Sequence, residues 1–326
     1  MAPDPPPSVG IAPPGPLPSL ARRAPRAWKR AAVPAVTYLL TWGTTTFVGM
    51  WIALDPSQVQ QAEDWRALAR AGFPGGLLFS VPLMAALTVH ELGHFIAQRH
   101  YRVPGTLPIF LPLPLPPFGT LGALIVMRGR IPSRRALFDI GASGPWAGLA
   151  LAIPFTLWGL RASEVIPGNA DAMAGLRFGS SWLFDALAWA ALGPVPADAT
   201  LNLHPTAFAG WAAIYVTGLN LLPVGQLDGG HVAYSLLGTR AHHLYRFLLA
   251  GMIGLTLFYA AGWCVVVALL LVFARSHPAP RDDREPLDFR RRILATATLV
   301  LFCLTFVPRP FESWTGLVHL IVDAMG

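Results

Sequence analysis

Cysteine and charged residues are both scarce in this 326-residue chain. The two cysteines, Cys264 and Cys303, lie in apolar runs, which argues against a disulfide framework and against thiolate metal ligands. Charged residues make up only 13% of the chain, whereas 54% of it is hydrophobic, and this balance excludes an ordinary soluble domain. The composition instead indicates a polytopic membrane protein.

The start of the chain also lacks a short apolar segment followed by a small-residue cleavage site. Residues 1–31 are instead rich in proline and arginine, so we expect a disordered N-terminal segment and no cleavable signal peptide. The net charge of +7 could suggest nucleic-acid binding. The basic residues lie mainly between apolar stretches, however, which is typical of membrane topology, so we expect no nucleic-acid partner.

Six apolar stretches approach or exceed the roughly 20 residues that a helix needs to cross a bilayer core. One of them, 244–274, is too long for a single untilted span and contains Ala261-Gly262-Trp263 near its middle, which favours a helical hairpin. A hairpin there also places most of the 24 basic residues on the cytoplasmic side. The sequence therefore predicts an all-α polytopic protein of about seven transmembrane helices, with six as the alternative. The six stretches are 33–54, 75–97, 136–160, 206–237, 244–274 and 293–307.

Residues 107–127 are apolar but rich in proline, so they cannot form an ordinary spanning helix. The segment 118–127 suits an extended strand or hairpin, in which Gly119 and Gly122 allow close backbone approach. Non-helical backbone at membrane depth is tolerated only where protein or a wet cavity covers it. We therefore expect a small membrane-associated β-element after the second span, beside the functional site.

A complete H-E-x-x-H pentad, residues 90–94, lies inside the second apolar stretch. Positions i and i+4 share one face of a helix, so His90 and His94 can bind the same divalent ion. Glu91 then lies beside the metal, where its carboxylate can take a proton from water. A carboxylate at bilayer depth costs roughly 2.5–3.5 kcal/mol on insertion scales, so its presence calls for a function.

A catalytic zinc ion takes three protein ligands and keeps one position open, so a third ligand must come from another span. Asp228 is the best candidate, because the glycines and the proline around it break the helix and can turn a carboxylate toward a cavity. The alternative is a carboxylate that caps the half-helix after the break. His231 is interpreted as a polar neighbour in preference to a fourth ligand.

Two further features lie near these residues. Asn220 could donate a hydrogen bond to a developing oxyanion or to substrate, although a hydrogen bond between helices explains it almost as well. Gly144 and Gly148 form a small-xxx-small pair that lets helix backbones approach closely, and Pro223 is assigned to the same structural class. The remaining histidines near predicted membrane boundaries are His204, His242 and His243.

Three landmarks, HELGH at 90–94, SGPWAG at 143–148 and NLLPVGQLDGG at 220–230, follow one another in successive spans. In this order they resemble the site-2 protease family of intramembrane zinc metalloproteases, over roughly residues 75–237. The segment FGTLGALIVM resembles the family's membrane-associated β-element, which is thought to pair with an unwound substrate segment. Many bacterial members carry a PDZ domain after the second landmark span, whereas residues 161–205 are too few for one.

The resemblance implies one zinc ion, bound by His90, His94 and Asp228. It also implies that Glu91 is the general base and that Asn220 lines the catalytic cleft. The residues implied in substrate binding are Phe118, Gly119, Thr120, Leu121 and Gly122.

The chain then divides into four parts. Residues 1–31 form a cytoplasmic N-terminus, and 32–74 hold the first transmembrane helix and an outside loop. Residues 75–237 form the metalloprotease core, and 238–326 hold the C-terminal transmembrane helices and a tail. Within this tail, 311–325 suit a short interfacial segment.

The expected function is hydrolysis of peptide bonds within or near transmembrane segments. The partners are then a single-pass transmembrane protein substrate and the lipid bilayer, while the oligomeric state stays open. Arg99 and Arg102 follow the pentad closely, which places the site near the cytoplasmic end of its span. We expect a prokaryotic plasma membrane, with the N-terminus and the active-site opening toward the cytoplasm.

Three rival classes share part of this pattern. A metal-binding membrane transporter should carry further polar residues along several spans, and a catalytically inactive scaffold should lack the general base or a ligand. A membrane zinc protease acting on prenylated C-termini also has H-E-x-x-H, but its third ligand is a glutamate. Glu91 is the only glutamate in the apolar stretches, which disfavours this last class.

Overall fold

In the part of the chain that it describes, the computed structural model is mostly helical and contains two short antiparallel sheets of two strands each. The residues that it describes are 27–54, 56–166, 178–196, 199–273 and 279–310. Most of the expected N-terminal segment, up to residue 26, and the expected interfacial segment 311–325 lie outside the described residues. The helix α1 begins at Ala27, so the last residues of the segment 1–31 are helical.

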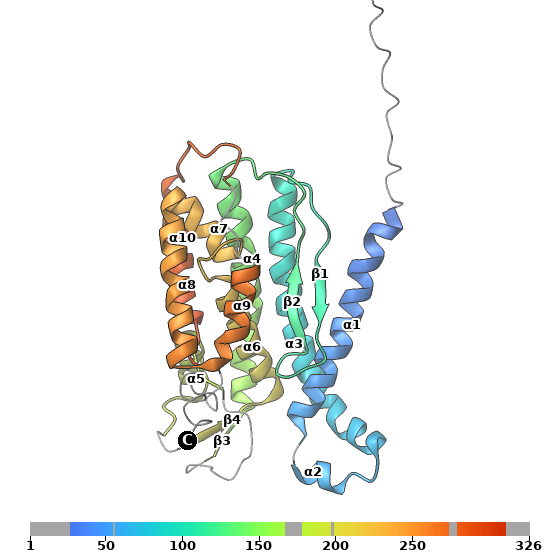
Figure 1. Ribbon diagram of the computed structural model, residues 1–326. Coiled ribbons are helices and arrows are strands. Elements are labelled where there is room, and N and C mark those ends of the chain that lie inside the picture. The colour runs from blue at the N-terminus through green and yellow to red at the C-terminus, as the bar shows by residue number, and fades with distance from the viewer. Residues whose placement is uncertain (1–26, 55, 167–177, 197–198, 274–278, 311–326) are drawn as a thin grey trace, which may run out of the picture.

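Among the described residues, two helices, α3 (Trp65–His100) and α4 (Arg134–Arg161), are long and apolar enough to span a bilayer, as judged by length and composition. Each is preceded by a polar cap residue whose side chain accepts a hydrogen bond from the first turn, Asp64 for α3 and Ser133 for α4. Figure 1 shows α4 next to α3 near the centre of the molecule, with α1 (Ala27–Ala53) on the other side of α3. The first three predicted apolar stretches correspond to these three helices.

The fourth predicted stretch, 206–237, is not one continuous helix. It forms α6 (Pro205–Asn220) and α7 (Asp228–Leu237), which are separated by the irregular segment 221–227. Gly225 has a φ of 53° in this segment, a conformation that favours glycine. The backbone is therefore irregular where the proline and glycine pattern predicted it.

The fifth stretch, 244–274, forms two helices, α8 (Ala241–Phe258) and α9 (Cys264–Phe273). A single 3₁₀ turn at Ala261–Trp263 joins them, and Figure 1 shows α9 running beside α8. The predicted helical break at Ala261-Gly262-Trp263 is thus present. The last stretch corresponds to α10 (Phe289–Thr305).

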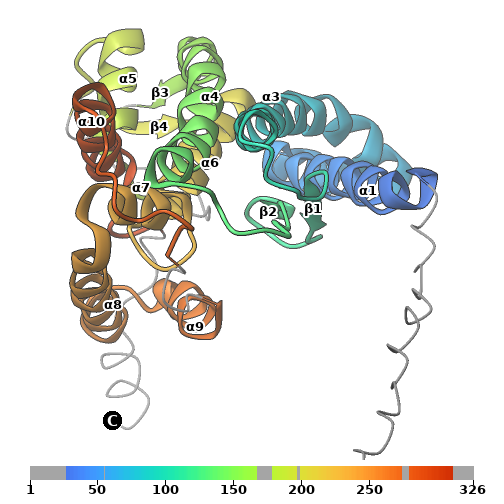
Figure 2. The same ribbon diagram turned by 90° about the horizontal axis from the view of Figure 1, so that it is seen from above.

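The expected β-element is a hairpin of β1 (Ile109–Pro112) and β2 (Thr120–Leu124), inserted between α3 and α4. Its second strand, β2, is shorter than the predicted segment 118–127, and its first strand lies before that segment. Viewed from above, β1 lies beside α1 and β2 lies further from it (Figure 2). Gly119 and Gly122 both have positive φ values, 76° and 91°, which explains the use of glycine at these positions.

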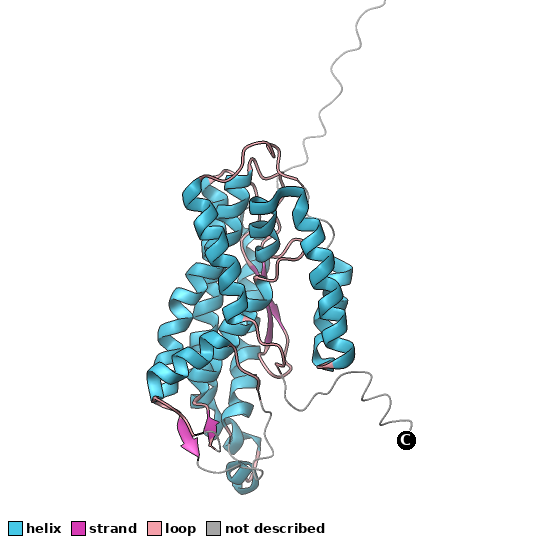
Figure 3. Ribbon diagram, turned by 90° about the vertical axis from the view of Figure 1, so that its left-hand side faces the viewer, coloured by secondary structure: helices cyan, strands magenta, loops and turns pink. Residues whose placement is uncertain are grey.

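The remaining elements cover the end of the molecule away from the start of α4. Figure 3 shows the second sheet at one end of the helices, while the first hairpin lies among them. The bounds of the remaining elements are α2 (Pro56–Gln61), β3 (Glu164–Ile166), α5 (Trp182–Leu192) and β4 (Thr200–Asn202).

The helix α6 forms the centre of the core, because all of residues 206–215 are buried. It approaches α4 through two glycines: a Cβ at Gly159 would overlap the Ala207 backbone, and one at Gly210 would overlap Thr156. One turn apart on α6, Trp211 and Tyr215 stack with ring centroids 5.4 Å apart. The close approach at the two glycines packs α6 against α4, and α7 contacts α4 as well.

Candidate metal centre

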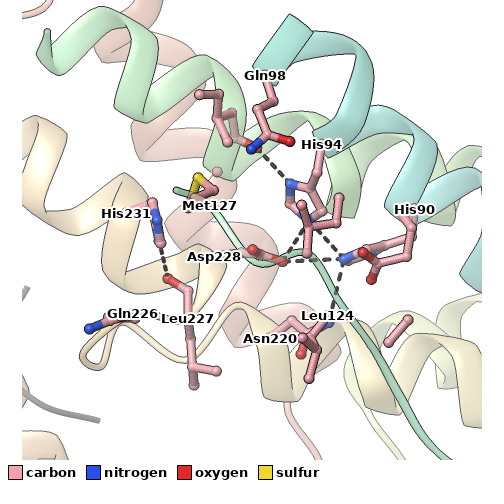
Figure 4. A pocket seen from close by; sticks show the side chains of 15 residues that line it. His90, His94, Gln98, Leu124, Met127, Asn220, Gln226, Leu227, Asp228 and His231 are labelled. Atoms are coloured by element: carbon pink, nitrogen blue, oxygen red, sulfur yellow. Dashed lines mark hydrogen bonds and ion pairs between the residues drawn. The ribbon is translucent and has the colours of Figure 1, made fainter. Parts of the chain in front are cut away.

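Three side chains from α3 and α7 meet at one point. His90 Nε2 and His94 Nε2 lie 3.1 Å apart, and each lies 3.2 Å from Asp228 Oδ2 (Figure 4). Among the described residues, the ligand atoms of these three side chains lie close enough together to bind one metal ion. Asp228 follows His94 by 134 positions, so the fold brings together residues from distant parts of the chain.

The three donor atoms fit a tetrahedral zinc ion. Bonds of about 2.0–2.2 Å place the ligand atoms of such an ion roughly 3.3–3.6 Å apart, close to the triangle seen here. His94 Nδ1 lies 2.7 Å from the carbonyl oxygen of Ile140, which can only accept a hydrogen bond. In the neutral ring Nδ1 therefore carries the hydrogen, and Nε2 presents its lone pair to the group, as zinc binding requires.

The helix α4 makes room for the two imidazoles. A Cβ at Gly144 would overlap the ring of His94, and a Cβ at Gly148 would lie 3.0 Å from His90 Cβ. On the next turn, a Cβ at Gly141 would lie 2.6 Å from His231 Cβ. The small-xxx-small pair thus lies directly against the two histidines, where the sequence placed a packing face.

The irregular segment between α6 and α7 positions Asp228. A Cβ at Gly229 would overlap the Leu221 carbonyl, and one at Gly230 would overlap that of Gly225, so the chain folds tightly back on itself. Pro223 is buried within this segment. Asp228 is the first residue of α7, whereas the cap position is Leu227, which makes no side-chain cap hydrogen bond. The alternative role of Asp228 as a helix cap therefore does not match the geometry.

A cavity of about 220 Å³ opens beside the three ligand atoms. Glu91 lines it and is only 7% exposed. Asn220 also lines it, and its side-chain nitrogen lies 3.4 Å from His90 Nε2. That contact joins α6 to α3 at the cavity wall, so both predicted roles of Asn220, a cleft residue and a contact between helices, agree with its position.

His231 also lines the cavity but is not in the group of potential ligands. Its Nδ1 lies 2.8 Å from the carbonyl oxygen of Leu227, in the turn before α7 (Figure 4). The interpretation of His231 as a polar neighbour agrees with this geometry.

The β-element reaches the cavity with different residues from those assigned to substrate binding. Phe118 packs against Trp211 and Tyr215, with ring centroids 6.0 and 5.7 Å apart, and none of residues 118–122 lines the cavity. The end of β2 and the segment after it do. The lining residues from this part of the chain are Ala123, Leu124, Ile125 and Met127.

Sequence reasoning also missed Gln98, which is buried and lines the same cavity. The signal was available, because Gln98 follows His94 by four residues and so lies on the helix face that carries both imidazoles. The apolar lining residues 123–127 carry no comparable signal, since their composition is that of any lipid-facing strand.

Comparison with known proteins agrees with this site. The model of peptidase family M50 matches residues 78–260, more than half of the chain. No solved structure matches the chain. Three similar proteins are named as probable chloroplastic zinc metalloproteases: EGY1 and EGY2 of Arabidopsis thaliana, and EGY1 of Oryza sativa subsp. japonica.

The identities and coverages of these three relatives show the extent of the similarity. EGY1 is 31% identical over 232 residues, covering 69% of this chain and 42% of EGY1. EGY2 is 28% identical over 264 residues, covering 80% of this chain and 46% of EGY2. Rice EGY1 is 30% identical over 233 residues, covering 69% of this chain and 39% of that protein. The chain thus spans less than half the length of these relatives. The region matched by the family model includes the three potential ligands, Glu91 and Asn220, and the chain belongs to peptidase family M50.

Proposed function

We propose that this chain is an intramembrane zinc metalloprotease, which hydrolyses peptide bonds within or near the transmembrane segments of membrane proteins. The observation that carries the proposal is the triangle of His90, His94 and Asp228 beside a buried glutamate. His90 and His94 lie on α3, a helix apolar enough to cross a membrane. The names of the similar proteins, probable zinc metalloproteases, support the same metal and reaction.

The three potential ligands, Glu91 and Asn220 each have a role in the proposed reaction. Zinc held by His90, His94 and Asp228 would acidify water and polarise the substrate carbonyl. Glu91 takes a proton from the attacking water and later donates it to the leaving amine. Asn220 donates a hydrogen bond from its side-chain nitrogen to the developing oxyanion.

The substrate is proposed to be a single-pass transmembrane protein whose helix unwinds locally, because a helical peptide bond is shielded by its own hydrogen bonds. An extended segment could add to the edge of β2 that β1 leaves unpaired. In this arrangement residues 118–122 contact the segment away from the cavity. Residues 123–127 contact it beside the metal centre.

The proposal includes a placement in the membrane. Seven spans would be formed by α1, α3, α4, the α6–α7 pair, α8, α9 and α10, with six as the alternative if α8 and α9 count as one. The distribution of basic residues supports a cytoplasmic N-terminus and a cytoplasmic opening of the site. The three relatives are named as chloroplastic, so a prokaryotic plasma membrane stays a proposal for this chain.

The test uses the purified full chain in liposomes with a labelled single-pass transmembrane substrate. Glu91→Gln should lower the cleavage rate about 10²–10⁴-fold, because it removes the proton acceptor, while zinc binding is kept. The matched control is Glu164→Gln, which changes an exposed glutamate in β3 and should leave the rate unchanged. Full activity of Glu91→Gln would exclude the proposed mechanism, and zinc flux without cleavage in the wild type would favour a transporter.

A further inference from the structure

A segment outside the matched region contacts α4 and α7, two of the helices that build the metal centre, and is linked to the end of α3 through Asp139 and Tyr101. We call residues 281–291, the end of the loop before α10 together with its first turn, the C-terminal clasp. Its backbone binds the segment before α4: Arg281 N–H donates to the Ile131 carbonyl, and Asp282 N–H to the Pro132 carbonyl, over 2.9 and 3.0 Å. Figure 1 shows this loop at the end of the molecule where α3 ends and α4 begins.

The strongest contact of the clasp is a two-pronged ion pair with α4. Arg291 Nε and Nη2 donate to the two carboxylate oxygens of Asp139, over 2.9 and 2.7 Å. The same guanidinium donates from Nη1 to Asp288, over 2.6 Å. At the end of α3, the Tyr101 hydroxyl donates to Asp139 as well. Asp139 thus joins α10, α4 and α3.

The donors of this cluster keep their hydrogens at any physiological pH. Arg291 keeps its charge because a guanidinium does not lose its proton in proteins. Burial and the bond to Asp139 raise the pKa of Tyr101.

Asp139 is directly followed by the residue that orients a metal ligand. The carbonyl of Ile140 accepts the hydrogen bond from His94 Nδ1 at 2.7 Å. A side-chain bond that holds Asp139 therefore restrains the turn of α4 that presents this carbonyl. The outer-shell partner of a ligating histidine sets its tautomer and its orientation.

A second arm of the clasp reaches the helix of the third ligand. Asp283 accepts from Arg134 Nε at 2.6 Å, and from the Tyr234 hydroxyl at 3.1 Å. Tyr234 lies on α7, which begins at Asp228. The clasp therefore ties the first turn of α4 to α7, and through Tyr101 it ties α4 to α3.

We propose that Arg291 is a positioning residue of the metal centre, which acts through Asp139 and the Ile140 carbonyl to hold His94 in the orientation that binds zinc. The inference rests on the proposed function, because it takes zinc to be the bound ion. It assigns the C-terminal helix, which lies beyond the family match at residue 260, a part in building the site.

The variants compare two ion pairs between the same parts of the chain. Arg291→Gln removes a charge whose side chain is 31% exposed, next to an Asp139 that is 24% exposed. The matched control is Arg135→Gln, because Arg135 lies 3.4 Å from Glu285 and these side chains are 48% and 65% exposed. Arg291→Lys keeps the charge but not the planar fork. The measurements on the full chain are the zinc dissociation constant by chelator competition, the midpoint of thermal unfolding, and kcat and KM separately.

Arg291→Gln should raise the zinc dissociation constant about tenfold and lower kcat by a similar factor, with KM within about twofold. Arg291→Lys should fall between Arg291→Gln and the wild type, and Arg135→Gln should match the wild type within about twofold. Adding Asp139→Asn to Arg291→Gln should bring little further loss, because both changes break the same pair.

The proposal is overturned if Arg291→Gln lowers the unfolding midpoint but leaves zinc binding and kcat unchanged, since its role is then structural only. Equal losses in Arg135→Gln would also overturn it. If Arg291→Gln does not fold, Arg291→Lys decides in the same way. Zinc binding without peptidase activity in the wild type would contradict the proposed function alone, whereas a wild type that binds no zinc contradicts both.

Discussion

Glycine has opposite surroundings in the metal-centre helices and in α8. In α4 and α7, there is no room for a side chain at glycines such as Gly144 and Gly229, because a Cβ would overlap a ligand histidine or a backbone carbonyl. At Gly251 and Gly254 of α8, a Cβ would meet no heavy atom of the described residues within 4 Å. The same residue type thus shapes a site in one region and marks an open helix face in the other.

Close packing limits side-chain size around the metal centre and not along the open face of α8. The backbones of α3, α4, α6 and α7 approach one another closely around the three ligand atoms. Even a small increase in side-chain volume in these helices should therefore move the ligands. The helix α8 turns several large side chains outward, including Phe247 and Phe258. We therefore expect substitutions to separate sharply between the two regions.

The largest difference is expected between two histidines. His94→Ala removes a proposed ligand and should lower peptidase activity roughly a thousandfold or more, because loss of the metal removes several kcal/mol of stabilisation from the transition state. His243→Ala, at an exposed position of α8, should leave activity unchanged. Initial rates on the same transmembrane substrate test this. Similar losses of activity in both variants would show that α8 is as sensitive to substitution as the metal-centre helices.

The next difference concerns the glycines themselves. Gly144→Ala forces a methyl group into the His94 ring and should weaken zinc binding and activity about 10–100-fold, the range found for changes that disturb ligand orientation. Gly254→Ala should leave both within twofold and stabilise α8 by about 0.5–1 kcal/mol. Zinc titration and thermal unfolding measure the two effects. A harmless Gly144→Ala would show that α4 can move away from the histidines.

A smaller effect is expected where α6 packs against α4. Gly210→Ala would overlap Thr156 and should destabilise the chain by about 1–3 kcal/mol, the usual cost of overpacking a core. The comparison is Gly251→Ala, for which we expect a neutral or slightly stabilising effect. The unfolding midpoint in detergent is the measurement. If Gly251→Ala is as damaging as Gly210→Ala, a partner covers α8.

The smallest effect is expected in the turn that follows α8, at the edge of the metal-centre region. Trp263, in the turn after α8, is fully buried and donates from Nε1 to the Pro308 carbonyl at 2.8 Å. Trp263→Phe should cost about 0.5–1.5 kcal/mol for the lost hydrogen bond, together with a packing term. Activity should stay within about twofold of the wild type. A large loss of activity would extend the metal-centre region to this turn.

Much of the site could be predicted because its signals are local. The spacing of His90 and His94 places two imidazoles on one helix face, and the pattern around Pro223 and Gly225 predicts the break that turns Asp228 inward. Helix length and apolar content likewise predicted most helices. The shift from one predicted stretch to the pair α6 and α7 follows from the same break.

The rest depends on contacts between distant positions, which leave no local pattern. Arg291 and Asp139 are 152 residues apart, so nothing in either segment indicates that they pair. Residues 123–125 and Met127 line the cavity because β2 contacts α3, whereas their apolar sequence predicts only an extended segment. The orientation of His94 by the Ile140 carbonyl is invisible in the sequence for the same reason.

The central claim is that His90, His94 and Asp228 together hold the metal ion. Elemental analysis of zinc in the purified wild type and in Asp228→Ala tests it most directly, with helical content checked by circular dichroism. The account predicts about one zinc ion per chain in the wild type and a small fraction of that in Asp228→Ala, at equal helical content. Equal zinc in the two proteins, or none in the wild type, would contradict it.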